Sequence, residues 1–380
     1  MRAIGLMSGT SMDGVDVALI ETDGERIVSF GPAGIYEYRD EERAVLRQAV
    51  ADAAGLSDRD ARPGALAEAE ALITNVHAQA VEAFMGDFGL GREDVDVVGF
   101  HGQTVLHRPK AGLTVQLGDG PLLSDMLNLD VVYDFRAADM AAGGQGAPFV
   151  PVYHRALVEA SELARPAVAI NLGGVANVTF IGRDDDLLAF DTGPGNAMID
   201  DWMFRQTGAA RDENGEAAAR GQADGRRLEA LLADRYFLQK PPKSLDRNAF
   251  SSSIVEGLSL EDGAATLTAF TVASLICGLA HLPATPAIFV LCGGGTRNAT
   301  LVGSLRKLLP GRVELADDIG WNAEAIEAQA FAYMAVRTLK GLPISFPGTT
   351  GVPAPMPGGV VARRADPREV EQANGSQGAL

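Results

Sequence analysis

Three glycine-rich turns, each following a short apolar run, constrain the possible folds of this chain more than any other feature of its sequence. The first is Gly9-Thr10-Ser11-Met12-Asp13-Gly14, which separates the runs 2–8 and 15–22 and predicts a strand, a turn and a second strand. Because glycine has no Cβ, backbone N–H groups at such a turn can approach an anion closely. The turn is therefore a candidate phosphate site, although a single glycine turn is more often only a hairpin.

The same pattern occurs again in the second half of the chain. The run 167–172 leads into Gly173 and Gly174, and another run follows at 178–182. Later, the apolar run 287–292 ends in Gly293-Gly294-Gly295, as expected of a buried strand that ends at a site. Two related halves with three glycine tips predict an α/β protein that binds the phosphates of a nucleotide. Neither the P-loop nor the Rossmann glycine string occurs in the sequence.

The remaining pattern predicts how helices and further strands fill the chain between these turns. A buried strand at 95–100 is expected to deliver the polar residues 101–104. A strand at 187–191 is expected to end at a polar turn, 192–196, where a helix starts. Other helices are predicted at about 41–53, 64–86, 215–235, 257–282, 298–309 and 323–340.

Composition and charge exclude several classes of protein. The chain has 380 residues, of which 47% are apolar and 22% charged, so it is long enough for two globular domains. A formal net charge of −18 argues against nucleic-acid binding, which needs a basic surface. The two cysteines lie in apolar stretches, and neither a signal peptide nor a membrane-spanning run is evident. We therefore expect a cytoplasmic protein with no nucleic-acid or membrane partner.

The expected domains follow the two halves. An N-terminal α/β domain is predicted over 1–135, with the segment at about 345–362 as a candidate addition to it. A C-terminal α/β domain is predicted over 136–345. Residues 363–380 have no apolar period and are expected to form a mobile tail.

Paired glycine hairpins followed by a late strand that ends in three glycines resemble the actin, Hsp70 and hexokinase superfamily. That resemblance implies a two-domain, ribonuclease H-like α/β fold with an interdomain cleft that holds ATP. At finer grain, the chain resembles the anhydro-N-acetylmuramic acid kinase family over nearly its whole length. The motifs that carry this resemblance, in the family's order, are LMSGTSMDGVD at 6–16, HGQT at 101–104, QLGDG at 116–120, DFRAADMAAGGQGAPFVP at 134–151, NLGGVANVT at 171–179, FDTGPGNAMID at 190–200, CGGGTRN at 292–298 and FPGTTGVPAPMPGG at 346–359.

The resemblance implies an ATP-dependent kinase of cell-wall recycling. Its substrate would be 1,6-anhydro-N-acetylmuramic acid, and water would open the anhydro ring while O6 is phosphorylated, giving N-acetylmuramic acid 6-phosphate and ADP. The family's catalytic aspartate corresponds to Asp191, which would deprotonate the water. The alternative is structural, with Asp191 only capping the turn that follows it.

The resemblance also implies ATP and Mg²⁺ as cofactors. Asp16 is placed to hold the Mg²⁺ of ATP, less surely Asp13, while the alternative for both is ordinary hairpin chemistry. Gly294, Gly295 and Asn298 would present a helix N-terminus to the nucleotide, or else form a glycine turn followed by an Asn cap. The residues expected to contact ATP are Gly9, Thr10, Ser11, Met12, Asp13, Gly14, Val15, Asp16, Gly173, Gly174, Gly294, Gly295 and Asn298.

The sugar would be bound by polar residues from several motifs. Arg136 matches a family position near the substrate, and arginine suits a carboxylate such as the lactyl group. The alternative is a surface ion pair of Arg136 with Asp134 or Asp139. Glu327 is a further substrate candidate because it lies on an apolar helical run, where a carboxylate is costly without a partner.

His101, Gln103 and Thr104 leave the buried strand together and are expected to bind sugar hydroxyls or the acetamide, although a lone histidine is more often structural. One departure concerns the run after Glu327, which commonly reads EAM in the family and ends in Gln329 here, so different local packing is expected.

Three rival functions stay open at this stage. The first is a kinase for another small sugar or acid, in which Asp191 deprotonates a hydroxyl directly. The second is an actin-like or Hsp70-like ATPase coupled to assembly or conformational change, and the third is a non-catalytic nucleotide-binding regulator. The expected partner is a small amino sugar, with a homodimer as an option for the assembly.

Overall fold

The computed structural model describes residues 1–364 except Thr10, Asp185 and Asn248. The chain forms two compact units, one from Met1–Ala156 together with the chain from Ala325 onward, the other from Leu157–Glu324. Of the tail expected at 363–380, all but Arg363 and Arg364 lies outside the described residues. These two hold Asp130: the guanidinium of Arg363 and the backbone N–H of Arg364 both donate to its carboxylate.

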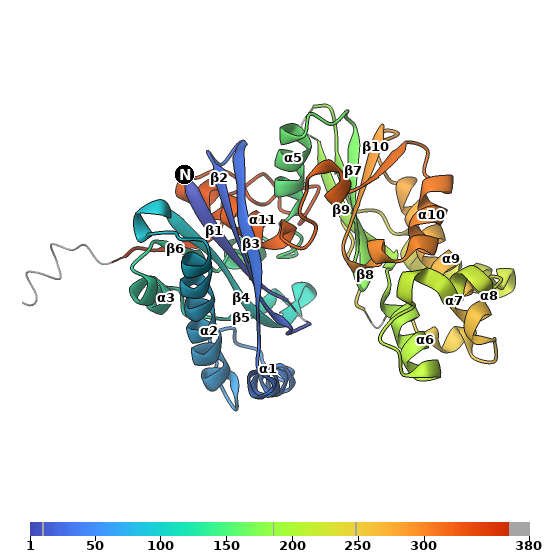
Figure 1. Ribbon diagram of the computed structural model, residues 1–380, viewed down its shortest axis with the longest axis horizontal. Coiled ribbons are helices and arrows are strands. Elements are labelled where there is room, and N and C mark those ends of the chain that lie inside the picture. The colour runs from blue at the N-terminus through green and yellow to red at the C-terminus, as the bar shows by residue number, and fades with distance from the viewer. Residues whose placement is uncertain (10, 185, 248, 365–380) are drawn as a thin grey trace, which may run out of the picture. The chain divides into compact units, whose positions relative to one another are not determined.

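The first unit is built on a sheet to which seven strands of the described chain contribute (Figure 1). Its order is β12-β6-β4-β1-β2-β3, and β5 pairs with the second half of β4. β1 is antiparallel to β2 and parallel to β4, so the expected strand pair around the first glycine turn is confirmed. The strands are β1 (Arg2–Ser8), β2 (Gly14–Thr22), β3 (Ile27–Glu37), β4 (Val97–Arg108), β5 (Leu113–Leu117), β6 (Val131–Tyr133) and β12 (Val360–Ala362).

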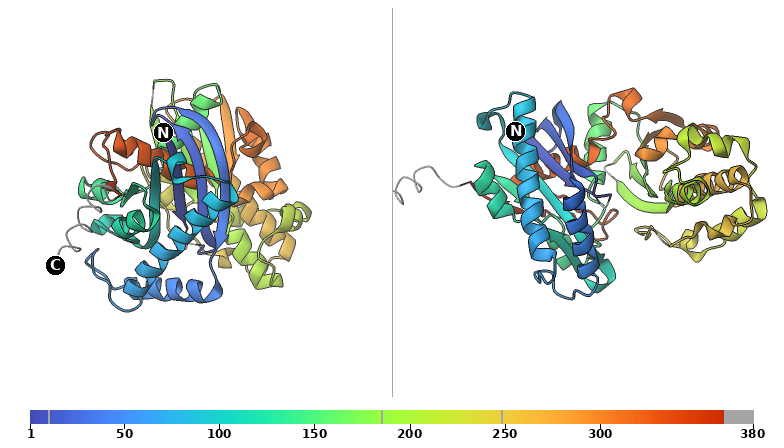
Figure 2. Two further views of the ribbon diagram at one scale, coloured as in Figure 1. Left: turned by 60° about the vertical axis from the view of Figure 1, so that its left-hand side comes forward. Right: turned by 60° about the horizontal axis from the view of Figure 1, so that its bottom comes forward.

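Helices cover both faces of this sheet because its central strands are apolar on both sides. α1 and α2 pack against each other on the face that carries Ile4, Leu6 and Val17 (Figure 2). α11 packs on the other face, where the alternating residues are small. The helices are α1 (Asp40–Ala53), α2 (Leu66–Asp87), α3 (Gly120–Leu127), α4 (Ala137–Ala141) and α11 (Ile326–Leu339), while α5 (Pro151–Ala160) contains the boundary between the units.

The close approach of α11 explains why the chain after Ala325 belongs to the first unit. A Cβ added to Gly5 on β1 would overlap the carbonyl oxygen of Ala328, and one added to Gly99 on β4 would overlap that of Phe331. Only glycine allows the helix to lie this near the strands. The two units therefore meet at other residues than the boundaries expected at 135/136 and near 345, because α4 and α11 both pack within the first unit.

The second unit has a separate sheet of five described strands in the order β11-β10-β7-β8-β9. β10 is parallel to both β7 and β11, whereas β8 is antiparallel to β7 and β9. The strands are β7 (Ala167–Leu172), β8 (Val175–Ile181), β9 (Leu187–Pro194), β10 (Ile288–Cys292) and β11 (Arg312–Leu315). The second strand pair around a glycine turn and the buried strand before the three glycines are both confirmed.

Helices of the second unit enclose two apolar clusters. One lies between the sheet and α9 and α10, and contains Ile170, Phe289 and Leu275. The other surrounds Trp202 and Phe270. The helix expected over 215–235 is divided, because α7 ends at Gly221 and a new helix begins after the cap Asp224. The helices are α6 (Ala197–Thr207), α7 (Glu216–Arg220), α8 (Gly225–Leu232), α9 (Leu260–Leu279) and α10 (Ala299–Leu308).

Among the described helices, α9 alone has the length and apolar character that could cross a bilayer. Two thirds of its most apolar window is buried inside the second unit, which is how the core helix of a globular domain also looks. The predicted class is confirmed as far as the elements show it: the chain has two α/β units, and in the sheet of each a glycine turn joins two antiparallel strands.

Candidate active site

The first glycine turn joins β1 to β2, whose pairing runs up to Met7 opposite Asp16. Met12 takes a positive φ of 54° and anchors the turn, because its side chain is buried in the core and its N–H donates to the Gly9 carbonyl. Asp13 accepts hydrogen bonds from the Ser11 hydroxyl at 2.7 Å and from the Gly14 N–H at 3.1 Å. The Asp13 carboxylate is therefore used within the turn, while Asp16 stands half-buried in β2 just after it.

The glycines expected to contact ATP fall into two groups. A Cβ added to Gly14 would lie 2.6 Å from the Tyr36 carbonyl oxygen, and one added to Gly295 would lie 2.7 Å from the Leu172 Cβ. These two are required by packing inside the protein. At Gly9, Gly174 and Gly294 the nearest atoms lie 3.6, 3.5 and 3.9 Å away, so packing does not require glycine there. Open backbone at a strand tip is what an anion needs.

Gln103 holds the first glycine turn in place through two hydrogen bonds. Its amide oxygen accepts from the Ser8 hydroxyl at 2.5 Å, and its amide nitrogen donates to the Gly9 carbonyl at 3.2 Å. Ser8 also shares a 2.7 Å hydrogen bond with the Tyr38 hydroxyl. Gln103 is fully buried and both its polar atoms are engaged, so in this arrangement it positions the turn. The contact of Gln103 with sugar stays a prediction.

A second polar cluster in the first unit centres on Arg136. Its guanidinium donates to the Gly146 carbonyl at 2.6 Å and lies 2.9 Å from Nε2 of His101. Burial, with the Arg136 charge as a second cause, lowers the pKa of His101 well below its ordinary range, so its neutral ring can accept that hydrogen bond. Burial also lowers the pKa of Arg136 to about 10, against the opposing charges of Glu327 and Asp139, and the side chain stays charged at neutral pH.

The surface ion pair considered as the alternative for Arg136 does not describe this arrangement. Asp134 pairs instead with Arg59 at 2.7 Å. Asp139 is buried and accepts from the Gly146 N–H at 2.6 Å. Three buried polar atoms of this cluster have no hydrogen-bond partner among the described residues: Nδ1 of His101, Nε of Arg136 and Oδ2 of Asp139. Buried polar atoms are rarely left unpaired, so this cluster has the character of a binding site.

Glu327, on the first turn of α11, belongs to the same cluster through its charge. Its side chain reaches solvent, yet surrounding protein raises its pKa above the ordinary value while Arg136 lowers it. The neighbouring Gln329 is buried and accepts from the Tyr153 hydroxyl at 2.9 Å, which accounts for the residue type that departs from the family run. Thr104 lies half-buried, with its hydroxyl 3.4 Å from the Gln116 amide nitrogen.

In the second unit, three polar turns meet. The N–H groups of Gly195 and Asn196, just before α6, donate to the carbonyls of Gly174 and Gly173, both at 2.9 Å. Gly293 has a φ of 83° and leaves no room for a Cβ beside the Asn171 side chain. The second glycine turn, the turn after β9 and the third glycine tip are therefore neighbours.

Asn298 begins α10 and caps it. Its side-chain oxygen accepts from the Leu301 N–H at 2.9 Å, and only 8% of the residue is exposed. The capping role that the sequence left as an alternative is thus present, and the expected contact of Asn298 with ATP stays a prediction. Gly294 and Gly295 lie in the short 3-10 helix Gly294–Arg297 that precedes it.

Asp191 lies inside β9, not at its end, and this corrects the expected strand boundary. It pairs with Asn177 of β8, and the strand continues to Pro194. Proline is tolerated there because β9 is the edge strand and needs partners on one side only. The Asp191 side chain does not cap the following turn: its Oδ2 accepts from the Leu245 N–H at 2.7 Å.

The environment of Asp191 suits a base. Burial raises the pKa of Asp191 to about 6, against the lowering effects of the Leu245 hydrogen bond and the Lys243 charge. The other carboxylate oxygen, Oδ1, has no hydrogen bond within the described part of the chain. One oxygen is thus held while the second is left open, and a carboxyl group that titrates near pH 6 can accept a proton at neutral pH.

Sequence reasoning missed three residues beside this site. Tyr236 and Lys243 both hydrogen-bond the backbone of Asp191. Arg247 pairs with Asp201 at 3.0 Å, and its Nε lies 3.8 Å from the position that a Cβ on Gly174 would take. They come from the irregular stretch between α8 and α9. That stretch has no hydrophobic period, so only the unusual lysine beside two prolines could have drawn attention to it.

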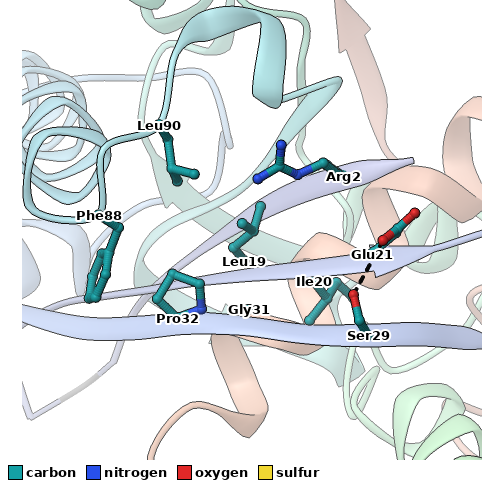
Figure 3. A pocket seen from close by; sticks show the side chains of 9 residues that line it. All are labelled: Arg2, Leu19, Ile20, Glu21, Ser29, Gly31, Pro32, Phe88 and Leu90. Atoms are coloured by element: carbon teal, nitrogen blue, oxygen red, sulfur yellow. Dashed lines mark hydrogen bonds between the residues drawn. The ribbon is translucent and has the colours of Figure 1, made fainter.

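A pocket of about 580 Å³ over β2 and β3 is lined by none of the predicted site residues (Figure 3). Leu19, Pro32 and Phe88 form its apolar wall. Its charged groups are already partnered, because Arg2 pairs with Asp94 and Glu21 accepts from Ser29 at 3.3 Å. With no unsatisfied polar group, it lacks the character of the Arg136 and Asp191 clusters.

The family model and the sequence relatives agree with each other. Residues 1–363 match the family model described as anhydro-N-acetylmuramic acid kinase. Proteins of that name from Rhodopseudomonas palustris (strain HaA2) and Nitrobacter winogradskyi are 56% and 54% identical, covering 96% of this chain and 99% and 100% of the relatives. Among solved structures, the Acidaminococcus fermentans (R)-2-hydroxyglutaryl-CoA dehydratase component A is 12% identical, with a TM-score of 0.47, covering 90% of this chain and 99% of that one.

Proposed function

The chain belongs to the anhydro-N-acetylmuramic acid kinase family, and from that premise we propose that it phosphorylates O6 of 1,6-anhydro-N-acetylmuramic acid with ATP while water opens the anhydro ring. This is a reaction of cell-wall recycling. Water adds to C1, the bond from C1 to O6 breaks, O6 bonds to the γ-phosphorus and ADP leaves. The rival functions expected from sequence have no observation in their favour.

The state of Asp191 is the observation that carries this proposal. The Leu245 N–H fixes one oxygen, the other has no hydrogen bond from the described residues, and burial raises the pKa of the carboxyl group to about 6. We assign to it the removal of a proton from the attacking water. A second carboxylic acid to protonate the leaving oxygen, as in glycoside hydrolases, is unnecessary because O6 is captured by the phosphoryl group.

Arg136 is proposed to bind the lactyl carboxylate of the sugar. Its unpaired Nε and charged guanidinium can add a charge-assisted hydrogen bond that the protein itself leaves unmade. We assign sugar hydroxyls or the acetamide to His101, whose Nδ1 is also unpaired, with Thr104, Gln103 and Glu327 as further candidates.

ATP supplies the phosphoryl group, and the Mg²⁺ bound to it offsets the phosphate charge. Backbone at the open glycines Gly9, Gly174 and Gly294 is proposed to approach the phosphates. Asp16 offers the carboxylate oxygen that Mg²⁺ prefers. Among the described residues, no group of three or more His, Cys, Asp or Glu side chains is placed to hold a metal ion. The other ATP contacts predicted from sequence are kept, with Thr10 outside the described residues.

A cytoplasmic location and a homodimer complete the proposal. ATP is available in the cytoplasm, and a kinase of recycled sugar acts where its cofactor is. The assembly is tested by measuring molar mass in solution at several protein concentrations, where a mass of one chain throughout would contradict the dimer.

The reaction is tested by running it in oxygen-18 water. Water attack on C1 places the label on C1 of the phosphorylated sugar and none on the phosphate, which mass spectrometry with fragmentation distinguishes. A sugar phosphate with no label at C1 would contradict ring opening by water and favour direct phosphorylation of a hydroxyl.

A further inference from the structure

Asp191 is held from several sides by one short stretch of chain. The Tyr236 hydroxyl donates to the Asp191 carbonyl at 2.5 Å, and the Asp191 N–H donates to the Lys243 carbonyl at 3.0 Å. The Leu245 N–H donates to Oδ2 of the carboxylate. We call Tyr236, Lys243 and Leu245 the clamp. It occupies the free edge of β9, where no further strand pairs.

Within the clamp, the Lys243 side chain folds back onto Tyr236. Its amine donates to the Tyr236 carbonyl at 3.0 Å and lies 4.3 Å from the centre of the Tyr236 ring and 5.9 Å from that of Phe190. Only 7% of the residue is exposed. An ammonium group buried between two aromatic rings is costly to desolvate, and a neutral side chain would fill the same space without that cost. A role for the charge itself is therefore indicated.

The charge of Lys243 acts on Asp191. Among the groups that bear on Lys243, the Asp191 carboxylate and the Cys277 thiol of α9 favour its charged form, while burial lowers its pKa. Tyr236 is neutral, since burial and the Asp191 charge raise the pKa of its hydroxyl. His281, two residues after the end of α9, packs edge-on against Phe190 and faces the Phe237 carbonyl.

We propose that Lys243 is a positioning residue for the reaction, which locks the clamp onto Asp191 and favours the ionised carboxylate that accepts the proton from water. This inference rests on the proposed base role of Asp191. Burial alone pushes Asp191 toward its neutral form, which cannot act as a base. The buried ammonium opposes that effect without contacting substrate.

The test compares pH profiles of kcat at saturating ATP and sugar. In the unmodified protein the acid limb is expected near pH 6, where Asp191 titrates. Lys243→Met removes the charge that lowers the Asp191 pKa, so that pKa rises and the acid limb moves up by about one pH unit. The loss of kcat is then roughly fivefold at pH 6 and approaches about tenfold at lower pH. Lys243→Arg keeps the charge and is expected to move the limb back toward its original position.

Lys240→Met is the matched control, because Lys240 is exposed and lies three residues away in the same stretch. Its profile should coincide with that of the unmodified protein. An acid limb of Lys243→Met that also coincides with it would overturn the inference.

Two further variants keep the outcome decisive. Tyr236→Phe deletes one hydroxyl of the clamp, and it is expected to lower kcat with little change in the KM for ATP. An unchanged kcat contradicts the clamp even if Lys243→Met does not fold.

Asp191→Asn separates this inference from its premise. Retained turnover in Asp191→Asn would defeat the base role itself, whereas an inactive Asp191→Asn with an unshifted Lys243→Met profile would defeat only the role of Lys243.

Discussion

At the scale of single residues, the division of labour between the two oxygens of Asp191 decides what the site can do. Oδ2 accepts from the Leu245 N–H, which fixes the carboxylate, and Oδ1, which no described residue hydrogen-bonds, is the oxygen proposed to accept the proton. Burial then raises the pKa of Asp191 to about 6. A general base is most effective when its pKa lies close to the pH at which the enzyme works. Neither property follows from the motif FDTGPGN alone.

The substitution Asp191→Asn tests this division directly. The amide oxygen of asparagine can still accept from the Leu245 N–H, so the fold and ATP binding should stay nearly intact while the basic oxygen is lost. We expect kcat to fall by about 10²- to 10⁴-fold. Steady-state kinetics with a nucleotide-binding measurement checks this, and a loss of only a few-fold would remove Asp191 from the role of base.

The two groups of glycines give a second prediction at this scale. Gly174→Ala adds a methyl group to open backbone, so the protein should fold normally while the KM for ATP rises several-fold. Gly295→Ala places its methyl group against Leu172 and should lower the thermal midpoint instead. Thermal unfolding and ATP kinetics on both variants separate the cases. Equal effects of the two substitutions on stability would contradict the assignment.

At the scale of elements, the packing of α11 against β1 and β4 requires glycine on both strands, because the helix backbone lies directly on them. Gly5→Ala would force α11 away from β1 and is expected to destabilise the protein by roughly 1–3 kcal/mol. Gly303→Ala, on α10 with no atom within 4 Å of the added methyl group, should gain roughly 0.5–1 kcal/mol from helix propensity. Urea denaturation of both variants measures the difference, and a neutral Gly5→Ala would show that α11 can relax.

The elements show where sequence patterns succeed and where they fail. The glycine hairpins, the buried strand before Gly293 and the long helices α2 and α9 were predicted because apolar period and turn residues agree there. β3 was not predicted. It contains Gly31, Pro32 and Gly34, which disfavour strands, and it forms as an edge strand that pairs with β2 alone.

For the candidate site, too, the sequence predicts some residues and misses others. Residues 101–104 were expected after the strand, yet they lie within β4, because Gly102 at a φ of 70° lets the strand continue through an irregular register. Asp191 and Arg136 were found through the family resemblance, while Lys243 and Tyr236 were not found. Their contacts depend on how an irregular loop returns to the β9 edge, and such long-range placement leaves no local pattern in sequence.

At the scale of the whole molecule, the two units differ in how they are made from the chain. The second is continuous, Leu157–Glu324, and holds its whole sheet and both apolar clusters within that range. The first is discontinuous, because α11 and β12 come from the far end of the chain.

This difference predicts the behaviour of fragments. Residues 157–324 alone should unfold cooperatively on heating, since the residues of both apolar clusters come from within that range. Residues 1–156 alone would leave the α11 face of β1, β2 and β4 uncovered, and they should bind a hydrophobic dye or aggregate. Circular dichroism and dye fluorescence of both fragments check this. A cooperative transition in residues 1–156 would show that α11 is dispensable.

Because α11 comes late in the chain, it also affects the order in which the two units can fold during synthesis. A ribosome releases β1 and β2 first, yet their small-residue face has no helix to cover it until residues 326–339 emerge. By then the second unit is complete and free to fold. We therefore expect the nascent chain to mature from its middle outward, with the N-terminal sheet exposed for most of translation and most in need of a chaperone during that interval.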